Sequence, residues 1–252
     1  MGKRALLLFV LCSSLLRAYE EPQVFLLSYP RSGNTWMRFC LEYLTKPPTC
    51  SFKENPADIK IYSQPLGLSI RELETDLSKP CIWKVHSRKR IEQIAPCLPH
   101  QDKIIFLIRN YRECLLRDLR DPLRILLELK NPDAIYFDNL SLYEKWDPKL
   151  RLMIYYEDLI ENPRFELQRV LLFLEEPSDL LEKFLIELPS LKQLSLTFYK
   201  KNLGPTNSEG IDLHHHSKRI SKALREEMDF EVMQRYPLFW ERYLSHYFYF
   251  SF

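Results

Sequence analysis

Glycine is scarce in this chain: only five of its 252 residues are glycine. An excess of charge of one sign is also missing, because the formal net charge is only +2, and this excludes the broad basic field with which proteins grip nucleic acid. Any anion that the chain binds must therefore be held by a local cluster. No cysteine pair has the CxxC spacing and no cluster of carboxylates is evident, so no metal site is expected.

The rest of the composition is that of an ordinary folded domain. Apolar residues make up 46% and charged residues 28% of the chain, and no internal repeat or low-complexity linker divides it. A chain of this length can bury one sizeable core, and nothing in it demands a second. Residues 20–252 are therefore expected to form a single domain.

The first twenty residues differ from the rest. A short basic start at Lys3 and Arg4 precedes an apolar stretch, Ala5–Leu16, and Ala18 is a candidate cleavage position. This layout predicts a signal peptide or N-terminal anchor in residues 1–19, and hence an exported, secretory-pathway or membrane-anchored protein whose only membrane contact is this segment. The alternative is a helix packed on the domain of a cytoplasmic protein.

Six cysteines leave the redox compartment open. Cys40, Cys81 and Cys114 fall inside apolar patterns and are expected to be buried thiols. Cys50 and Cys97 stand in loop-like sequence and are able to pair in an oxidising compartment.

Three other patterns are conspicuous but weak. Asn139-Leu140-Ser141 is a formal glycosylation sequon, and such triplets are frequent by chance. Adjacent side chains in His214–His216 point in different directions, so we treat them as loop or helix-entry residues rather than metal ligands. The aromatic C-terminus, Tyr236–Phe252, is expected to pack as a final helix, with a partner or membrane contact through its last six residues as the alternative.

Short apolar runs alternate with helical patterns along the chain. Helical spacing follows the first run in Thr35–Leu44, and a strongly periodic helix starts near Pro163. This alternation predicts an α/β domain with a central parallel sheet flanked by helices, and the unbroken apolar runs fit burial on both faces. The predicted strands are Val24–Ser28, Cys81–Val85, Lys103–Ile108 and Leu150–Tyr155.

Polar and charged side chains stand at the carboxyl end of each predicted strand. In open α/β sheets, ligands bind outside these ends, so four groups that meet at one edge favour a single site. The groups are Arg31–Thr35 after the first strand, Lys84 and His86 at the second, Arg109 after the third, and Tyr156–Asp158 after the fourth.

The bend after the first strand has the features of a phosphate cradle. A tight turn between a strand and a helix aims backbone N–H groups at one point, with the helix dipole behind them. Gly33 would let the backbone approach a ligand oxygen, Ser32, Asn34 and Thr35 would add donors, and Arg31 would place a charged fork beside the anion. The GxxxxGK[ST] spacing of an ATP-type P-loop is absent.

These segments resemble the sulfotransferases that use 3′-phosphoadenosine 5′-phosphosulfate (PAPS). "YPRSGNTW", Tyr29–Trp36, resembles the family's 5′-phosphosulfate loop, and "KVH", Lys84–His86, resembles its Lys-x-His motif. "KIIFLIRNYRE", Lys103–Glu113, resembles the motif whose Arg binds the 3′-phosphate, and "YYEDLIENP", Tyr155–Pro163, resembles the segment whose Tyr lies near the adenine. The four segments follow the family's order.

Three departures from the family pattern stand beside the resemblance. Tyr111 replaces the Pro that commonly follows Arg-Asn, and Arg117 stands where the family has a Ser that contacts the 3′-phosphate. The family's late "RKG" loop has two candidates, "HHHSKRIS" and "FYKKN". We favour Lys218 and Arg219 in the first, because a helix pattern follows them.

The resemblance implies in-line transfer of a sulfuryl group from PAPS to a hydroxyl- or amine-bearing acceptor, without a metal ion. It implies His86 as the base that takes the acceptor's proton, with Lys84 and Arg31 stabilising charge on the transferring group. The co-substrate would be bound by Arg31, Ser32, Gly33, Asn34, Thr35, Trp36, Arg109, Arg117, Tyr156, Lys218 and Arg219.

Alternatives remain at the level of the sequence. A catalytically idle nucleotide-binding protein would keep the cradle and lose transfer, and an NTP-dependent phosphotransferase is a third option that lacks the GK[ST] signature and a magnesium carboxylate. Residue by residue, His86 could be an ordinary loop histidine, Lys84 could snorkel from a strand end, Arg109 could pair with Glu113, and Tyr156 could be plain core.

Overall fold

Five parallel strands form the centre of the computed structural model, which describes residues 23–46, 49–51, 82–89, 91, 102–203 and 220–247. Their order across the sheet is β2-β3-β1-β4-β5, so the first apolar run of the chain lies in the middle. The predicted signal peptide or anchor, Lys218, Arg219 and His214–His216 lie outside the described residues. The strands are β1 (Val24–Ser28), β2 (Thr49–Ser51), β3 (Ile82–Val85), β4 (Lys103–Ile108) and β5 (Arg151–Tyr155).

The predicted parallel sheet is confirmed, and one strand is added to it. All four strand pairs in the sheet run parallel, with Leu27 opposite Val85 on one side of β1 and opposite Phe106 on the other. The added strand, β2, has only three residues, Thr-Cys-Ser. Two of the three are polar, so it carried no apolar signal by which it could be predicted.

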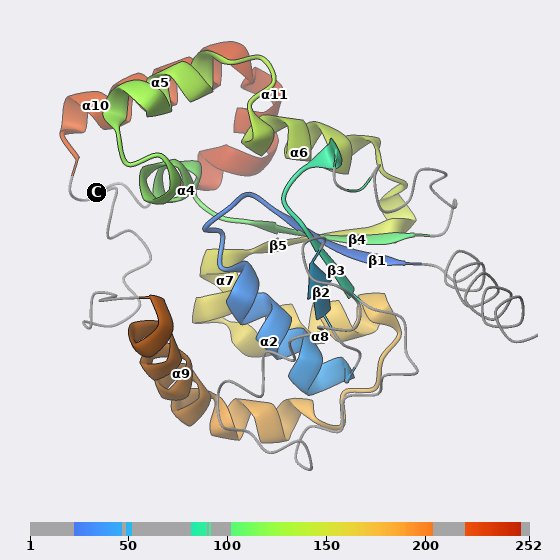
Figure 1. Ribbon diagram of the computed structural model, residues 1–252. Helices are drawn as coiled ribbons and strands as arrows, with labels where there is room; N and C mark the ends of the chain where they lie inside the picture. The colour runs from blue at the N-terminus through green and yellow to red at the C-terminus, as the bar shows by residue number, and fades with distance from the viewer. Residues whose placement is uncertain are drawn as a thin grey trace, which may run out of the picture.

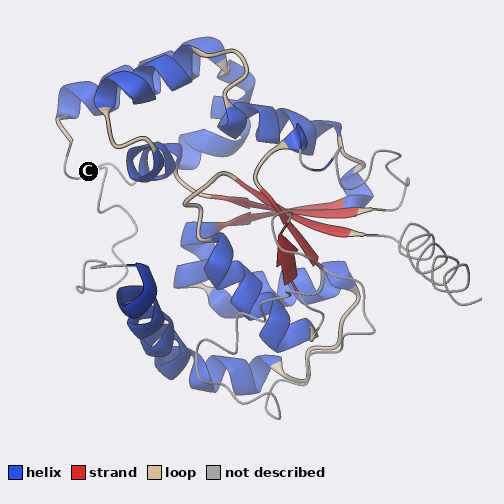
Figure 2. Ribbon diagram, viewed as in Figure 1, coloured by secondary structure: helices blue, strands red, loops and turns tan. Residues whose placement is uncertain are grey.

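Helices cover both faces of the sheet (Figures 1 and 2). Figure 1 places α2, α7, α8 and α9 on one side, and α4, α5, α6, α10 and α11 on the other. The helices are α2 (Asn34–Thr45), α4 (Tyr111–Asp118), α5 (Pro122–Lys130), α6 (Ile135–Lys145), α7 (Tyr156–Glu161), α8 (Pro163–Leu174), α9 (Leu181–Leu203), α10 (Lys222–Arg235) and α11 (Pro237–Phe239), with shorter turns η3 (Pro148–Leu150), η5 (Trp240–Leu244) and η6 (Ser245–Tyr247).

Two hydrophobic cores result from the alternation of side chains along the strands. Phe25 and Leu27 of β1 pack into one core, whereas Leu26 between them packs into the other. In β4, Phe106 faces the first core and Ile105 the second. All of these side chains are buried, which is why the strands read as unbroken apolar runs.

The buried-thiol prediction is confirmed for two cysteines, whereas the predicted loop position of Cys50 and the single final helix are not: Cys50 lies in β2. Cys40 and Cys114 are buried free thiols, as expected; Cys81 and Cys97 lie outside the described residues. The C-terminal segment packs against the domain in the short helical turns η5 and η6 rather than one regular helix, and Tyr247 is 1% exposed. Residues beyond Tyr247 are not described.

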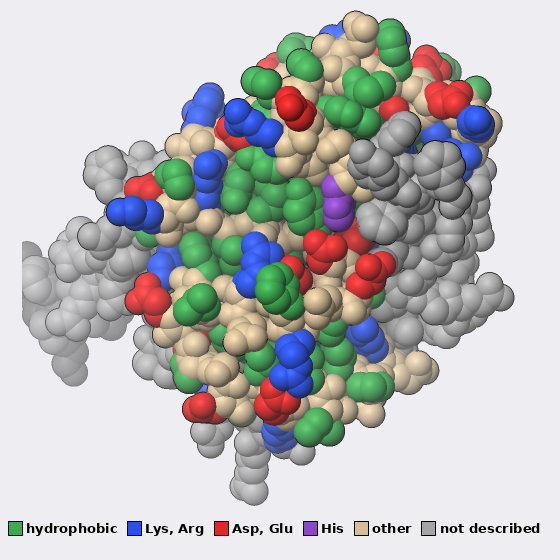
Figure 3. Space-filling view, turned by 180° about the vertical axis from the view of Figure 1, so that it is seen from behind, with side chains coloured by type: hydrophobic (Ala, Val, Ile, Leu, Met, Phe, Trp, Pro, Cys, Tyr) green, Lys and Arg blue, Asp and Glu red, His purple; other side chains and the backbone are tan. Residues whose placement is uncertain are grey.

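The surface bears no field of one sign on the face that Figure 3 shows: charged side chains of both signs are interspersed with hydrophobic ones. This matches the net charge of +2. No helix in the described part of the chain combines the length and the apolar character that a membrane crossing requires. Among the same residues, no group of three or more His, Cys, Asp or Glu side chains could hold a metal ion.

Candidate active site

Every strand end that was predicted to carry chemistry lies at the carboxyl edge of the sheet. Arg31–Thr35 connects β1 to α2, Lys84 and His86 stand at the end of β3, Arg109 follows β4, and Tyr156 begins α7 directly after β5. Because the strands are parallel, these positions meet at one edge. The sequence pattern therefore predicted the location of the candidate site.

The bend between β1 and α2 contains two left-handed residues. Arg31 has φ 70° and Gly33 has φ 87°. The carbonyl of Gly33 accepts hydrogen bonds from the Trp36 and Met37 amides at 3.0 and 3.2 Å and so starts α2. Glycine adopts this conformation freely, but for an arginine it stores strain of about 1–2 kcal/mol. Strain of this kind concentrates at functional sites.

Gly33 is required by a neighbouring aromatic ring. A Cβ atom at this position would lie 2.1 Å from Cε2 of Tyr156, far inside van der Waals contact. From the sequence, Gly33 was predicted to leave room for a ligand oxygen to approach the backbone. In the structure the Tyr156 ring takes that space, so Gly33 and Tyr156 form one interlocking pair.

Three of the side chains predicted to bind the co-substrate face protein partners. Ser32 is fully buried, and its Oγ lies 3.3 Å from Sγ of Cys114 on α4. Asn34 donates from Nδ2 to Oγ of Ser28 at 2.8 Å. Trp36 stacks on Phe39 with 5.3 Å between ring centroids. The parts of the bend that remain to contact an anion are its backbone, Thr35 and the exposed Arg31.

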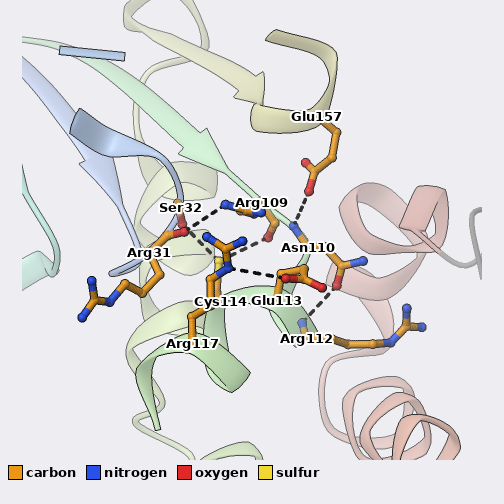
Figure 4. A network of polar contacts seen from close by, with 9 residues as sticks. All are labelled: Arg31, Ser32, Arg109, Asn110, Arg112, Glu113, Cys114, Arg117 and Glu157. Carbon is orange, nitrogen blue, oxygen red and sulfur yellow. Dashed lines mark hydrogen bonds and ion pairs between the residues drawn. The ribbon is translucent and has the colours of Figure 1, made fainter. Parts of the chain in front are cut away.

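Arg109 and Arg117 bring two positive charges together behind the bend (Figure 4). Arg109 is 2% exposed and donates to the carbonyl of Arg31 at 3.4 Å. Burial, and next the charge of Arg109, lower the pKa of Arg117. Its Nε lies 3.5 Å from Oε2 of the buried Glu113. In Figure 4 the Arg31 side chain extends away from this pair.

Glu157 was grouped with Tyr156 at the end of the fourth predicted strand but was given no role of its own. Its Oε1 accepts from the Asn110 amide at 3.1 Å and its Oε2 from the Tyr247 hydroxyl at 3.3 Å. Burial raises the pKa of this carboxyl to about 6. The only signal in the sequence was its position directly after Tyr156, at the end of a strand.

His86 is held as a neutral imidazole with a defined tautomer. Nδ1 lies 2.8 Å from the carbonyl oxygen of Ser28 and 3.3 Å from its Oγ. A carbonyl can only accept, so Nδ1 carries the proton and the lone pair is on Nε2. Burial, and next the charge of Lys84, lower the pKa of His86 to about 4. The side chain is therefore an unprotonated base at physiological pH.

Tyr111, where the family commonly has Pro, joins the site to the C-terminal part of the chain. Its fully buried hydroxyl donates to Oδ1 of Asp229 on α10. The neighbouring Arg112 donates to both oxygens of the same carboxylate at 2.6 Å. The helix after Arg109 is thereby tied to α10, which begins directly after the segment that contains Lys218 and Arg219.

Comparisons with known proteins bear on the C-terminal half of the sequence and on the fold. The family model described as "Sulfotransferase domain" matches residues 130–244. The solved structure of mouse sulfotransferase SULT7A1 complexed with PAP has a TM-score of 0.58 to this chain at 17% identity, covering 91% of this chain and 89% of that chain. The chain is therefore similar to sulfotransferases in the sequence of residues 130–244 and in its fold. The fold that the sequence predicted is that of this sulfotransferase.

Two sulfotransferase domains are also similar at lower TM-scores. One, from the curacin biosynthetic pathway, has a TM-score of 0.49 at 18% identity and covers 85% of this chain and 97% of that chain. The other, from the Synechococcus PCC 7002 olefin synthase, has a TM-score of 0.46 at 20% identity and covers 87% of this chain and 94% of that chain. No curated protein matches the sequence.

Proposed function

We propose that the protein transfers a sulfuryl group from PAPS to a hydroxyl- or amine-bearing acceptor, with His86 as general base. The observation that carries the proposal is the meeting of a neutral His86, the strained Arg31 bend and the Arg109–Arg117 pair at one edge of the sheet. The match to the sulfotransferase domain and the fold shared with a PAP-bound sulfotransferase support it.

The described residues fit an anionic nucleotide. Arg117 is half-buried beside Arg109 at a cost that shows in its lowered pKa, and an anion between the two would relieve that repulsion. We assign the 3′-phosphate to this pair, together with Lys218 and Arg219. The backbone of Arg31–Thr35 would hold the 5′-phosphosulfate at the start of α2, Tyr156 and Trp36 would lie beside the nucleotide, and PAPS would supply the sulfuryl group.

The chain's own groups supply proton transfer and electrostatic stabilisation. With Nδ1 donating to Ser28, the Nε2 lone pair of His86 is left to take the acceptor's proton. Lys84 and Arg31 would stabilise the negative charge that develops as the acceptor attacks. Like phosphoryl transfer, this reaction depends on position and charge more than on covalent help.

The test is calorimetric titration of the domain with 3′-phosphoadenosine 5′-phosphate, followed by transfer assays with labelled PAPS. We expect tight binding that weakens about tenfold or more in Arg109→Ala and Arg117→Ala, because each removes a positive charge from the proposed phosphate contact. Arg120→Ala, at an exposed position just after α4, serves as the matched control. Binding without transfer to any acceptor would indicate the idle nucleotide-binding protein, and no binding would refute the proposal.

For the N-terminal segment we propose a signal peptide or anchor within residues 1–19, on its basic start and apolar stretch. Expression of the full chain in secreting cells should give either a protein shortened at about Ala18 or one that stays with the membrane fraction. A full-length protein in the cytosolic fraction would refute this.

A further inference from the structure

His86 is fixed at two points by elements that are distant in the sequence. Its ring bonds to β1, through the carbonyl of Ser28, which lies 58 residues earlier in the chain. Its main-chain carbonyl accepts a hydrogen bond of 3.1 Å from Nδ2 of Asn139 on α6, 53 residues later. These two bonds restrain the ring and the backbone separately.

The hydrogen bond of the His86 ring lies one residue beyond the last paired residues of β1 and β3. The register between β1 and β3 ends with Leu27 opposite Val85, and one step further Ser28 would stand opposite His86. There the imidazole lies 2.8 Å from the Ser28 carbonyl oxygen. Ser28 is fully buried, so this acceptor is shielded from water that could replace the ring. The ring is therefore held against the last residue of β1, the central strand of the sheet.

The hydrogen bond to the His86 carbonyl comes from the buried side chain of Asn139. Asn139 is fully buried, and its Oδ1 has no hydrogen-bond partner in the described part of the chain. Burying the Asn139 Oδ1 without a hydrogen-bond partner is unfavourable. The hydrogen bond from its Nδ2 to the His86 carbonyl offsets this cost. Burial also removes Asn139, the first residue of the formal glycosylation sequon, from the folded surface.

We propose that Asn139 is a positioning residue for His86: by holding the carbonyl of His86 it keeps the ring in the Nδ1–H tautomer, with Nε2 directed to the acceptor. The proposal rests on the proposed function for its catalytic consequence, but not for its structural part. Without the Asn139 bond, the bend after β3 would hold His86 by its ring alone. The ring could then rotate and bond through Nε2, which would place the lone pair on the wrong nitrogen.

The first measurement is the ¹⁵N chemical shifts of the His86 imidazole, assigned by the loss of its signals in His86→Gln. We expect a protonated Nδ1 and an unprotonated Nε2 in the parent at neutral pH, and a mixture of tautomers in Asn139→Ala. Leu140→Ala is the matched control, because Leu140 is equally buried on the same helix. A protonated Nε2 in the parent, or an unchanged tautomer in Asn139→Ala, would overturn the proposal.

The second measurement is kinetic and separates positioning from packing. We expect kcat to fall about tenfold further in Asn139→Ala than in Leu140→Ala, with KM for PAPS unchanged within about twofold, because only proton removal is affected. The charged groups that act on His86 are Lys84 on β3, Asp118 on α4 and Arg38 on α2. Because the ring would move relative to these charges in Asn139→Ala, the acid limb of the pH profile should also move. Equal kcat in the two variants would contradict the proposal.

The two measurements distinguish the failure of this proposal from failure of the proposed function. The tautomer result needs no PAPS and no acceptor. If the parent has the expected tautomer and Asn139→Ala loses it, yet no acceptor is sulfated, then the positioning role stands and the sulfotransferase activity fails. If transfer is observed and the tautomer does not change in Asn139→Ala, then the sulfotransferase activity stands and the positioning role fails.

Discussion

The Arg109 guanidinium lies 4.5 Å from the centre of the Tyr156 ring, and the same ring covers Gly33. Residues that follow β4, β5 and β1 thus meet in one contact. A cation above an aromatic face contributes about 0.5–2 kcal/mol, more when it is shielded from water. Arg109 is therefore held in place before a ligand arrives, and the bend, the ring and the cation act as one unit.

Gly33→Ala should disrupt this unit. The new Cβ would overlap the Tyr156 ring, and alanine would also have to adopt φ 87°. We expect the free energy of unfolding to fall by more than about 2 kcal/mol, measured by urea denaturation, and binding of 3′-phosphoadenosine 5′-phosphate to weaken in step.

A double variant separates the overlap from the backbone strain. Tyr156→Ala removes the ring, so Gly33→Ala should cost less in that background than in the parent. The coupling is expected to exceed about 1 kcal/mol. Strict additivity of the two changes would mean that the ring and Gly33 do not constrain each other.

Substitutions of Arg31 test whether backbone strain at the bend is retained for function. Its φ of 70° suits glycine, so Arg31→Gly should be about 1 kcal/mol more stable than Arg31→Ala in thermal unfolding. Both variants should lose affinity for 3′-phosphoadenosine 5′-phosphate, because both lack the guanidinium. Lys46, an exposed residue with φ 68° after α2, is the control: Lys46→Gly should gain stability over Lys46→Ala without losing affinity. Equal stability of the two Arg31 variants would argue against strain.

Local patterns predicted four of the five strands and the charged residues at their ends, whereas partners far apart in the sequence were not predictable. The apolar runs of β1 and β4 indicated burial on both faces, and the residues after them favoured an anion site, which stays a prediction. Nothing local indicated that Ser28 and Asn139 would hold His86 across 58 and 53 residues. The Tyr156 ring above Gly33 is a packing contact between two strand ends and equally lies outside any spacing rule.

The contacts of Asp229 are another case of partners far apart in the sequence that could not be predicted, and they offer a test of stability. Its carboxylate accepts from the Tyr111 hydroxyl and from both donating nitrogens of Arg112, and the ion pair is almost fully buried. Removing one partner leaves an uncompensated charge, so Asp229→Ala should lower the free energy of unfolding by about 3–5 kcal/mol. Glu226→Ala removes an exposed pair with Lys222 on the same helix and should cost under about 1 kcal/mol. Similar losses in the two variants would show that the pair does not anchor α10.

His86 and Glu157 should contribute to stability with opposite dependence on pH. The pKa of His86 falls from 6.5 to about 4 on folding, so below pH 6.5 the unfolded chain binds a proton that the folded chain does not, and stability is lost as the pH falls. The pKa of Glu157 rises from 4.5 to about 6, so the folded chain binds the extra proton, and stability is lost as the pH rises through this range.

Unfolding of the parent, His86→Gln and Glu157→Gln between pH 4.5 and 7 measures both effects. The stability of the parent relative to His86→Gln should decrease toward acid, by at most about 3 kcal/mol for the full shift. Relative to Glu157→Gln it should increase toward acid, by at most about 2 kcal/mol. Each variant is the control for the other, because a general acid effect would move both differences in one direction. A stability difference from His86→Gln that increases toward acid would mean that His86 is not held neutral, and a neutral His86 is what the proposed base requires.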